Sequence, residues 1–224
     1  MKRHKLAGCE WFDFFSFLTV KTLWHSCSVG FVIYMSYKTE ETVYFTEIGE
    51  GNTDVTLKLA KERAEKLGIK TIVVASTRGM TGVQASEFFE GYNVVVVSHH
   101  TGYKGADVQE LTSENWEKIE ASGGKVLVAG HVFGGVGRAV RRKFKTYQVD
   151  EVIAATLKVF GPGTKVCAEI VLMAADAGVI SIQEDVIAIG GTGRGADTAL
   201  VMRPVNAFDF FNLKIREVIC KPLL

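Results

Sequence analysis

Short continuous runs of apolar residues alternate along the chain with longer stretches of helical periodicity. The runs at 71–76 (TIVVAS), 93–98 (NVVVVS), 125–130 (KVLVAG) and 185–190 (DVIAIG) are rich in β-branched residues. Such runs, short and without polar alternation, are typical of strands buried on both faces of a parallel sheet. We therefore predict four buried strands.

The stretches between these runs have the periodicity of helices. LKLAKERAEKLG follows the capping residues at 52–54 and ends at Gly68, which indicates a complete helix with start and stop signals. Ser113 and Asp150 are candidate caps of two later helices. The further predicted helices cover 83–91, 113–124, 149–161 and 164–178, with another inside the segment 131–147.

This alternation predicts an α/β domain, a three-layer sandwich whose mostly parallel sheet has about five strands and helices on both faces. Residues 198–204 (TALVMRP) supply the fifth strand. The connection before it is too short for a helical crossover, so this strand and 185–190 form a C-terminal antiparallel hairpin. We expect the hairpin at the sheet edge, with 213–220 as a candidate last edge strand.

Composition narrows the class of protein. The chain has 224 residues, of which 47% are apolar and 23% charged, as in a globular domain with an appended segment. A net charge of +1 gives no long-range field for nucleic acid or an anionic membrane, so neither is expected as a partner. The four cysteines form no CxxC pair, which argues against a zinc site and fits reduced thiols in a cytoplasmic protein.

The N-terminus differs from the rest, so we divide the chain into an extension over 1–35 and an α/β domain over 36–224. The extension is basic and then apolar, like a signal peptide, but acidic residues interrupt it and no cleavage site follows. Its apolar part is too short and polar for a membrane span. We expect either an added segment or a start site assigned upstream of Met35.

Polar residues gather directly after the predicted strands, where an open α/β sheet binds its ligands. The loop 76–82 leads into a helix N-terminus, whose amides and dipole favour phosphate, and Arg78 adds a cation. The glycine-rich loop, residues 190–197, offers further backbone amides beside Arg194. The sixteen expected ligand-binding residues are Ser76, Thr77, Arg78, Gly79, Thr81, Gly82, His99, Thr101, Gly102, His131, Gly191, Thr192, Gly193, Arg194, Gly195 and Asp197.

Each of these features also has a purely structural interpretation. The loop 76–82 can be an ordinary capped turn, and the glycines of the hairpin can serve only to reach positive φ angles. Asp197 can orient Arg194 or cap the turn. The histidines at 99, 100 and 131 can act as acid–base groups, or they can hydrogen-bond the loop backbone or a ligand, and a metal site is not expected because too few ligands accompany them.

Other charged groups are expected on solvated helix faces. Glu169 and Asp176 lie seven residues apart on one helix, which places them on one side of it. The basic residues between 138 and 145 have the same interpretation, with contact to an anionic ligand or partner as the alternative. Two nucleotide motifs fail, because GxxxxGK[ST] is absent and GGVGRAV (134–140) lacks the third glycine of an NAD fingerprint.

Four motifs in order, NTDVTLKLAKERAEKLGIKTIVVAST, VVVVSHHTGY, VCAEIVLMAADAGVI and VIAIGGTGRGADTALVMRP, resemble a family of stand-alone archaeal and bacterial proteins. That family is similar in fold to the C-terminal α/β domain of pyruvate kinase, and the resemblance covers Val43 to Pro222. Arg78-Gly79-Met80 departs from the usual family pattern, in which small or acidic residues stand there.

The resemblance implies binding rather than pyruvate kinase catalysis, which belongs to a barrel domain that this chain is too short to hold. In pyruvate kinases the corresponding loops hold a phosphorylated effector, and the stand-alone family is associated with flavin mononucleotide (FMN). The expected function is therefore binding of a phosphorylated small molecule, FMN, at the strand ends. A flavin-dependent oxidoreductase and a regulatory or assembly module are the alternatives, and a homo-oligomer is a possible assembly.

Overall fold

A computed structural model describes residues 37–223 of the chain, and the residues from Glu40 onward form one compact unit. The extension predicted over 1–35, with its alternative start at Met35, lies outside the described residues. Within 37–223, no helix has the length and apolar character that crossing a membrane requires.

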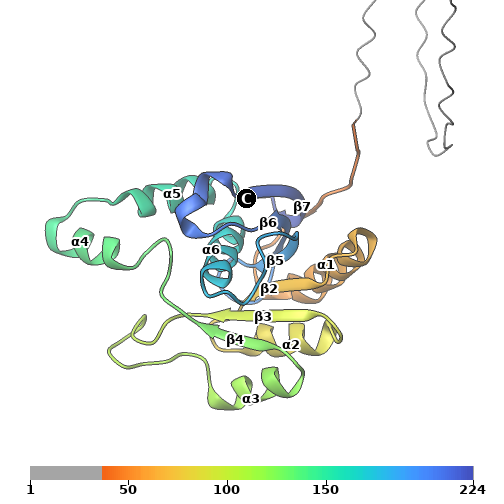
Figure 1. The fold of residues 1–224 in the computed structure, drawn as a ribbon, viewed down its shortest axis with the longest axis horizontal. Coiled ribbons are helices and arrows are strands. Elements are labelled where there is room, and N and C mark those ends of the chain that lie inside the picture. The colour runs from red at the N-terminus through yellow and green to blue at the C-terminus, as the bar shows by residue number, and fades with distance from the viewer. Residues whose placement is uncertain (1–36, 224) are drawn as a thin grey trace, which may run out of the picture. The chain divides into compact units, whose positions relative to one another are not determined.

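The unit is built on a seven-stranded sheet with the order β1-β7-β6-β5-β2-β3-β4 (Figure 1). Strands β5, β2, β3 and β4 are parallel neighbours, β6 is antiparallel to β5 and β7, and β1 is parallel to β7. The strands are β1 (Val43–Phe45), β2 (Thr71–Ala75), β3 (Asn93–Ser98), β4 (Lys125–Val128), β5 (Val186–Gly190), β6 (Thr198–Arg203) and β7 (Lys214–Pro222).

Helices cover both faces of the sheet and give the predicted three layers. One apolar core joins α1, α2 and α3 to alternate strand residues such as Ile72 and Val74, and a second joins α5 and α6 to the intervening residues such as Val73. The helices are α1 (Thr53–Leu67), α2 (Met80–Phe88), α3 (Ser113–Ala121), α4 (Val136–Phe144), α5 (Val149–Lys158) and α6 (Pro162–Asp176), with 3-10 turns η1 (Glu50–Asn52) and η2 (Ala207–Asn212). The α/β class with its antiparallel C-terminal hairpin is confirmed.

The place of the hairpin in the sheet was predicted wrongly. Strands β5 and β6 lie in the interior, because almost every residue of both is buried and each needs a hydrogen-bonded neighbour on either side. Strand β7 is also interior, since the short strand β1, which the sequence did not indicate, pairs with its C-terminal residues and forms the edge. The helix caps are shifted as well, to Thr112 for α3 and Gln148 for α5.

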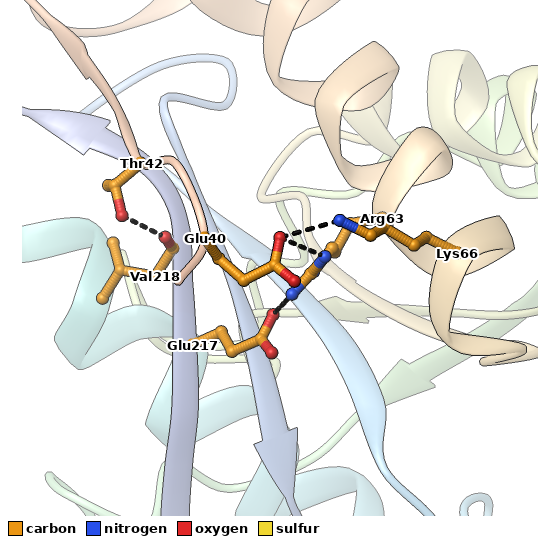
Figure 2. Close-up of polar contacts among 6 residues, drawn as sticks. All are labelled: Glu40, Thr42, Arg63, Lys66, Glu217 and Val218. Atoms are coloured by element: carbon orange, nitrogen blue, oxygen red, sulfur yellow. Dashed lines mark hydrogen bonds and ion pairs between the residues drawn. The ribbon is translucent and has the colours of Figure 1, made fainter. Parts of the chain in front are cut away.

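A cluster of ion pairs joins the segment before β1 to helix α1 and strand β7 (Figure 2). The Arg63 guanidinium on α1 donates to Glu40 at 2.8 Å and also pairs with Glu217 on β7, and Lys66 donates to Glu40 at 2.9 Å. The Thr42 hydroxyl donates to the Val218 carbonyl at 2.9 Å. These contacts hold the edge strand in register with β7.

Candidate functional site

A cleft of about 660 Å³ opens at the carboxyl ends of the parallel strands, and we call it the strand-end cleft. Residues that follow β2, β3, β4 and β5 line it, together with residues of η1, α1 and α6. Its volume lies within the range of about 300–1,000 Å³ that is typical of small-molecule sites. The parallel strands therefore bring loops from four parts of the chain to one place.

The loop after β2 is ordered by its own hydrogen bonds. The Ser76 hydroxyl is buried and accepts the Gly82 N–H at 3.0 Å, so it caps the first turn of α2. Gly79 precedes the helix at φ 99°, a left-handed conformation that favours glycine. Arg78 is exposed and its side chain makes no hydrogen bond or ion pair within the described residues. The loop presents a free cation beside the N-terminus of a nine-residue helix.

The glycine-rich loop is held by the side chain of Asp197, which is fully buried. Its carboxylate accepts the N–H of Gly49 at 2.9 Å and of Thr192 at 3.0 Å, and the hydroxyl of Thr198 at 2.8 Å. Asp197 therefore caps the turn, as one of the two interpretations expected. The Arg194 side chain is exposed on the cleft and makes no hydrogen bond or ion pair within residues 37–223.

Gly195 lets the glycine-rich loop pack directly on the start of α1. Its φ is 70°, and a Cβ there would lie 2.5 Å from Glu50 Cα and from Thr53 Oγ1. The neighbouring Thr53 hydroxyl accepts the Ala196 N–H at 3.0 Å, which fixes this approach. The close packing of the loop on η1 and α1 depends on the missing side chain.

We expect Gly195→Ala to lower the free energy of unfolding by about 2–4 kcal/mol, from backbone strain and the clash with Glu50 together. Gly193→Ala is the matched control, since its φ of 90° is equally strained but nothing lies within 4 Å of its Cβ. Its cost should stay near ~1 kcal/mol. Urea denaturation measures both, and equal losses would contradict the packing role of Gly195.

A buried carboxylate forms the floor of the cleft. Glu169 on α6 is 4% exposed and accepts the Phe133 N–H at 3.2 Å, while the Lys165 ammonium and His131 Nδ1, at 3.4 Å, contact its other oxygen. Burial by itself raises the pKa of Glu169, but the bonds from His131 and Lys165 outweigh it and hold the pKa at about 2. The expectation that Glu169 is solvated is wrong, whereas Asp176 is exposed at the end of the helix.

The three histidines cluster where the loops after β3 and β4 meet. His131 lies 5.1 Å from His99 and 5.3 Å from His100 between ring centroids, and it stacks on Tyr103 at 4.9 Å. His99 Nδ1 pairs with the Glu110 carboxylate at 2.9 Å. His99 and His131 line the strand-end cleft, and His100 does not.

Most of the residues predicted from the sequence line this cleft, and some of the others pack behind it. Gly79 packs against α3, Gly82 against Val96, and Asp197 is buried. Thr101 and Gly102 lie farther out, in an exposed turn. The predicted residues that line the cleft are Ser76, Thr77, Arg78, Thr81, His99, His131, Gly191, Gly193, Arg194 and Gly195, and those that do not are Gly79, Gly82, Thr101, Gly102, Thr192 and Asp197.

The sequence did not indicate two parts of the cleft. Glu50 and Asp54 line it from η1 and α1, and Ile170 and Met173 of α6 supply apolar surface. The acidic residues belong to a segment whose pattern indicates only a helix start, and the apolar ones belong to a helix that is buried almost throughout. Among residues 37–223, no group of three histidine, cysteine, aspartate or glutamate side chains could hold a metal ion.

This architecture, a parallel α/β sheet with a ligand-sized cleft at its strand ends, matches a known family over residues 54–202, the pyruvate kinase alpha/beta domain. The chain belongs to this family. Among solved structures, a pyruvate kinase from Cryptosporidium parvum is 16% identical with a TM-score of 0.38, and the match covers 68% of this chain and 23% of that one. The chain thus spans less than a quarter of that enzyme.

A second solved protein, O-ureido-L-serine synthase, is 20% identical with a TM-score of 0.27, and the match covers 42% of this chain and 30% of that one. A mutant of the same enzyme with O-ureido-L-serine bound gives 19% identity, a TM-score of 0.28, and coverage of 56% and 47%. These weak similarities carry no information on the chemistry of the strand-end cleft.

Proposed function

We propose that the protein binds a phosphorylated small molecule, FMN, in the strand-end cleft. The observation that carries the proposal is that two exposed arginines, Arg78 and Arg194, line a ligand-sized cleft. Neither side chain pairs with a carboxylate within the described residues. A phosphate group would supply the negative charge that neither guanidinium group finds in a carboxylate partner.

The backbone around these arginines suits the same group. The start of α2 offers helix N-terminal amides, and the glycine-rich loop lets its backbone approach a ligand closely at Gly191 and Gly193. Donors from two loops thus line the same cleft.

The remaining surface of the cleft fits the rest of FMN. Val166, Ile170 and Met173 on α6 provide an apolar wall for a planar ring, and Glu50 and Asp54 can accept hydrogen bonds from the hydroxyls of the ribityl chain. When bound, FMN would supply electron-transfer chemistry. A flavin-dependent oxidoreductase and a regulatory or assembly module stay predictions, as does a homo-oligomer.

Arg78→Ala and Arg194→Ala are each expected to weaken FMN binding by about tenfold or more, because each removes a charge-assisted hydrogen bond to phosphate. Both residues are exposed, so the melting temperature should change little. Quenching of flavin fluorescence on titration of the full chain measures the dissociation constant. Riboflavin, which lacks the phosphate, should bind equally to the native protein and to both variants.

Lys158→Ala is the matched control, an exposed cation on α5 outside the cleft. It should bind FMN like the native protein. Native protein that neither quenches flavin fluorescence nor gains thermal stability with FMN would reject the proposal. Unchanged binding in both arginine variants would instead return the glycine-rich loop to a purely structural role.

A further inference from the structure

A second cavity, of about 560 Å³, lies beside helix α4, and we call it the α4 cavity. Three cations line it, Arg138, Arg142 and Lys143, and its inner wall holds His100 and His131. Within the described part of the chain, no aspartate or glutamate lines it. The lining of the cavity therefore carries positive charge and no carboxylate, and the acidic groups that act on Arg138, Glu151 and Glu169, lie outside it.

The basic residues of α4 lie on two different faces of the helix. Arg141 faces helix α5 and pairs with Glu151 at 2.9 Å, and Gly137 lies against the carboxylate of Asp150. Arg138 and Arg142, four residues apart, point into the α4 cavity on another face of the helix. Arg141 thus has a close ion-pair partner on α5, whereas Glu151 acts on Arg138 without forming an ion pair with it. A merely solvated basic helix does not need this division.

Protein groups already stabilise the charge of Arg138, because a hydrogen bond with Tyr103 raises its pKa, burial lowers it, and the charges of Glu151 and Glu169 raise it further. Arg138 lies in the first turn of α4, where the helix dipole disfavours cations. Its guanidinium lies over the Tyr103 ring, with Cζ 5.5 Å from the centroid, and its Nε is buried without a hydrogen-bond partner among the described residues. An anion in the cavity would accept a hydrogen bond from the unpartnered Nε and would complement the helix dipole.

Two histidine ring nitrogens beside the cavity also lack hydrogen-bond partners. His100 Nδ1 and His131 Nε2 are both buried and unpartnered in the described part of the chain. The pKa of His100 is lowered by burial first and then by His131, His99 and Arg138, so its surroundings disfavour added positive charge. Buried polar atoms without partners are uncommon and mark places where a ligand or water is missing.

We propose that the α4 cavity binds the oxyanion group of a small molecule, a phosphate or a carboxylate, through Arg138, Arg142 and Lys143. This site is separate from the strand-end cleft and does not rest on FMN binding there. Since His131 lines both cavities, the two ligands would meet at its ring. The fold then holds a pair of adjacent anion sites with one imidazole between them.

The histidine rings distinguish the two sites, because His99 lines only the cleft and His100 only the α4 cavity. We would follow their ¹H–¹³C NMR signals while inorganic phosphate, and separately acetate, is added to the full chain at constant ionic strength. A saturable shift of His100 is expected with at least one anion. The class of oxyanion follows from whether phosphate, acetate or both produce this saturable shift.

The double variant Arg142→Gln/Lys143→Gln should weaken the His100 response by roughly tenfold or more in dissociation constant. Lys158→Gln is the control for loss of an exposed charge, and Arg194→Ala is the control for the cleft. Both should leave the His100 curve unchanged. A linear, unsaturable response, or a response that the double variant retains, overturns the proposal, whereas an unchanged His99 signal on FMN addition counts only against the cleft.

Discussion

Replacing Asp197 with alanine is expected to lower the free energy of unfolding by about 3 kcal/mol or more. The change leaves three donors without an acceptor, the buried Gly49 N–H and Thr198 hydroxyl and the part-buried Thr192 N–H. Each unsatisfied buried donor costs about 1–3 kcal/mol, and these three cannot all recover water. Urea denaturation at neutral pH measures the loss.

Two controls separate this effect from the loss of a charge. Asp197→Asn keeps one acceptor oxygen and should fall between the native protein and alanine. Asp185→Ala removes a partly exposed carboxylate that pairs with Arg203 and Arg216, and should cost no more than about 1 kcal/mol. A loss below about 1 kcal/mol for Asp197→Ala would show that the loop does not depend on this carboxylate.

The second large effect is an acid sensitivity that Glu169 confers. Its pKa is lowered from an ordinary 4.5 to about 2 in the folded protein, so folding favours the ionised form. The corresponding stability, roughly 3 kcal/mol, is fully present above pH 4.5 and is lost as the pH falls toward 2. Above that range the unfolded chain is ionised as well, so no further change is expected from this group.

The measurement compares unfolding free energies of native protein and Glu169→Gln between about pH 7 and the lowest pH at which both fold. The difference between them should be largest near neutrality and should shrink as the pH falls below about 4.5. Glu184→Gln, at an exposed position, should run parallel to the native curve. Parallel curves for Glu169→Gln too would refute a coupling of this carboxylate to folding.

Local patterns predicted most of the fold, because the strands that carry the core are short, apolar and β-branched. Strands β2, β3 and β5 are buried along nearly their whole length and stand out for that reason. Strand β7 has an exposed first half and β1 has three residues, so neither gives a clear signal. Their order depends on pairing between distant segments, which no local window contains.

The site was predictable where it follows from strand direction and hidden where it depends on tertiary partners. Loops after parallel strands must meet, so His99 and Arg194 were found together. Glu169 has one partner that the sequence offers, Lys165, four residues earlier on the helix. Its second partner, His131, comes from a loop that only the folded sheet brings near, and that contact decides whether the carboxylate is solvated or buried.

The pairing of β1 with β7 has a consequence for how the chain reaches its native state. The Thr42 hydroxyl and the Val218 carbonyl are 176 residues apart in sequence, so this contact closes nearly the whole domain into one loop. Such high contact order slows folding, because the chain entropy of the loop is lost before its contacts form. During synthesis, β1 can pair only after β7 has left the ribosome. Until then the backbone N–H and C=O groups of β1 have no strand partner in β7.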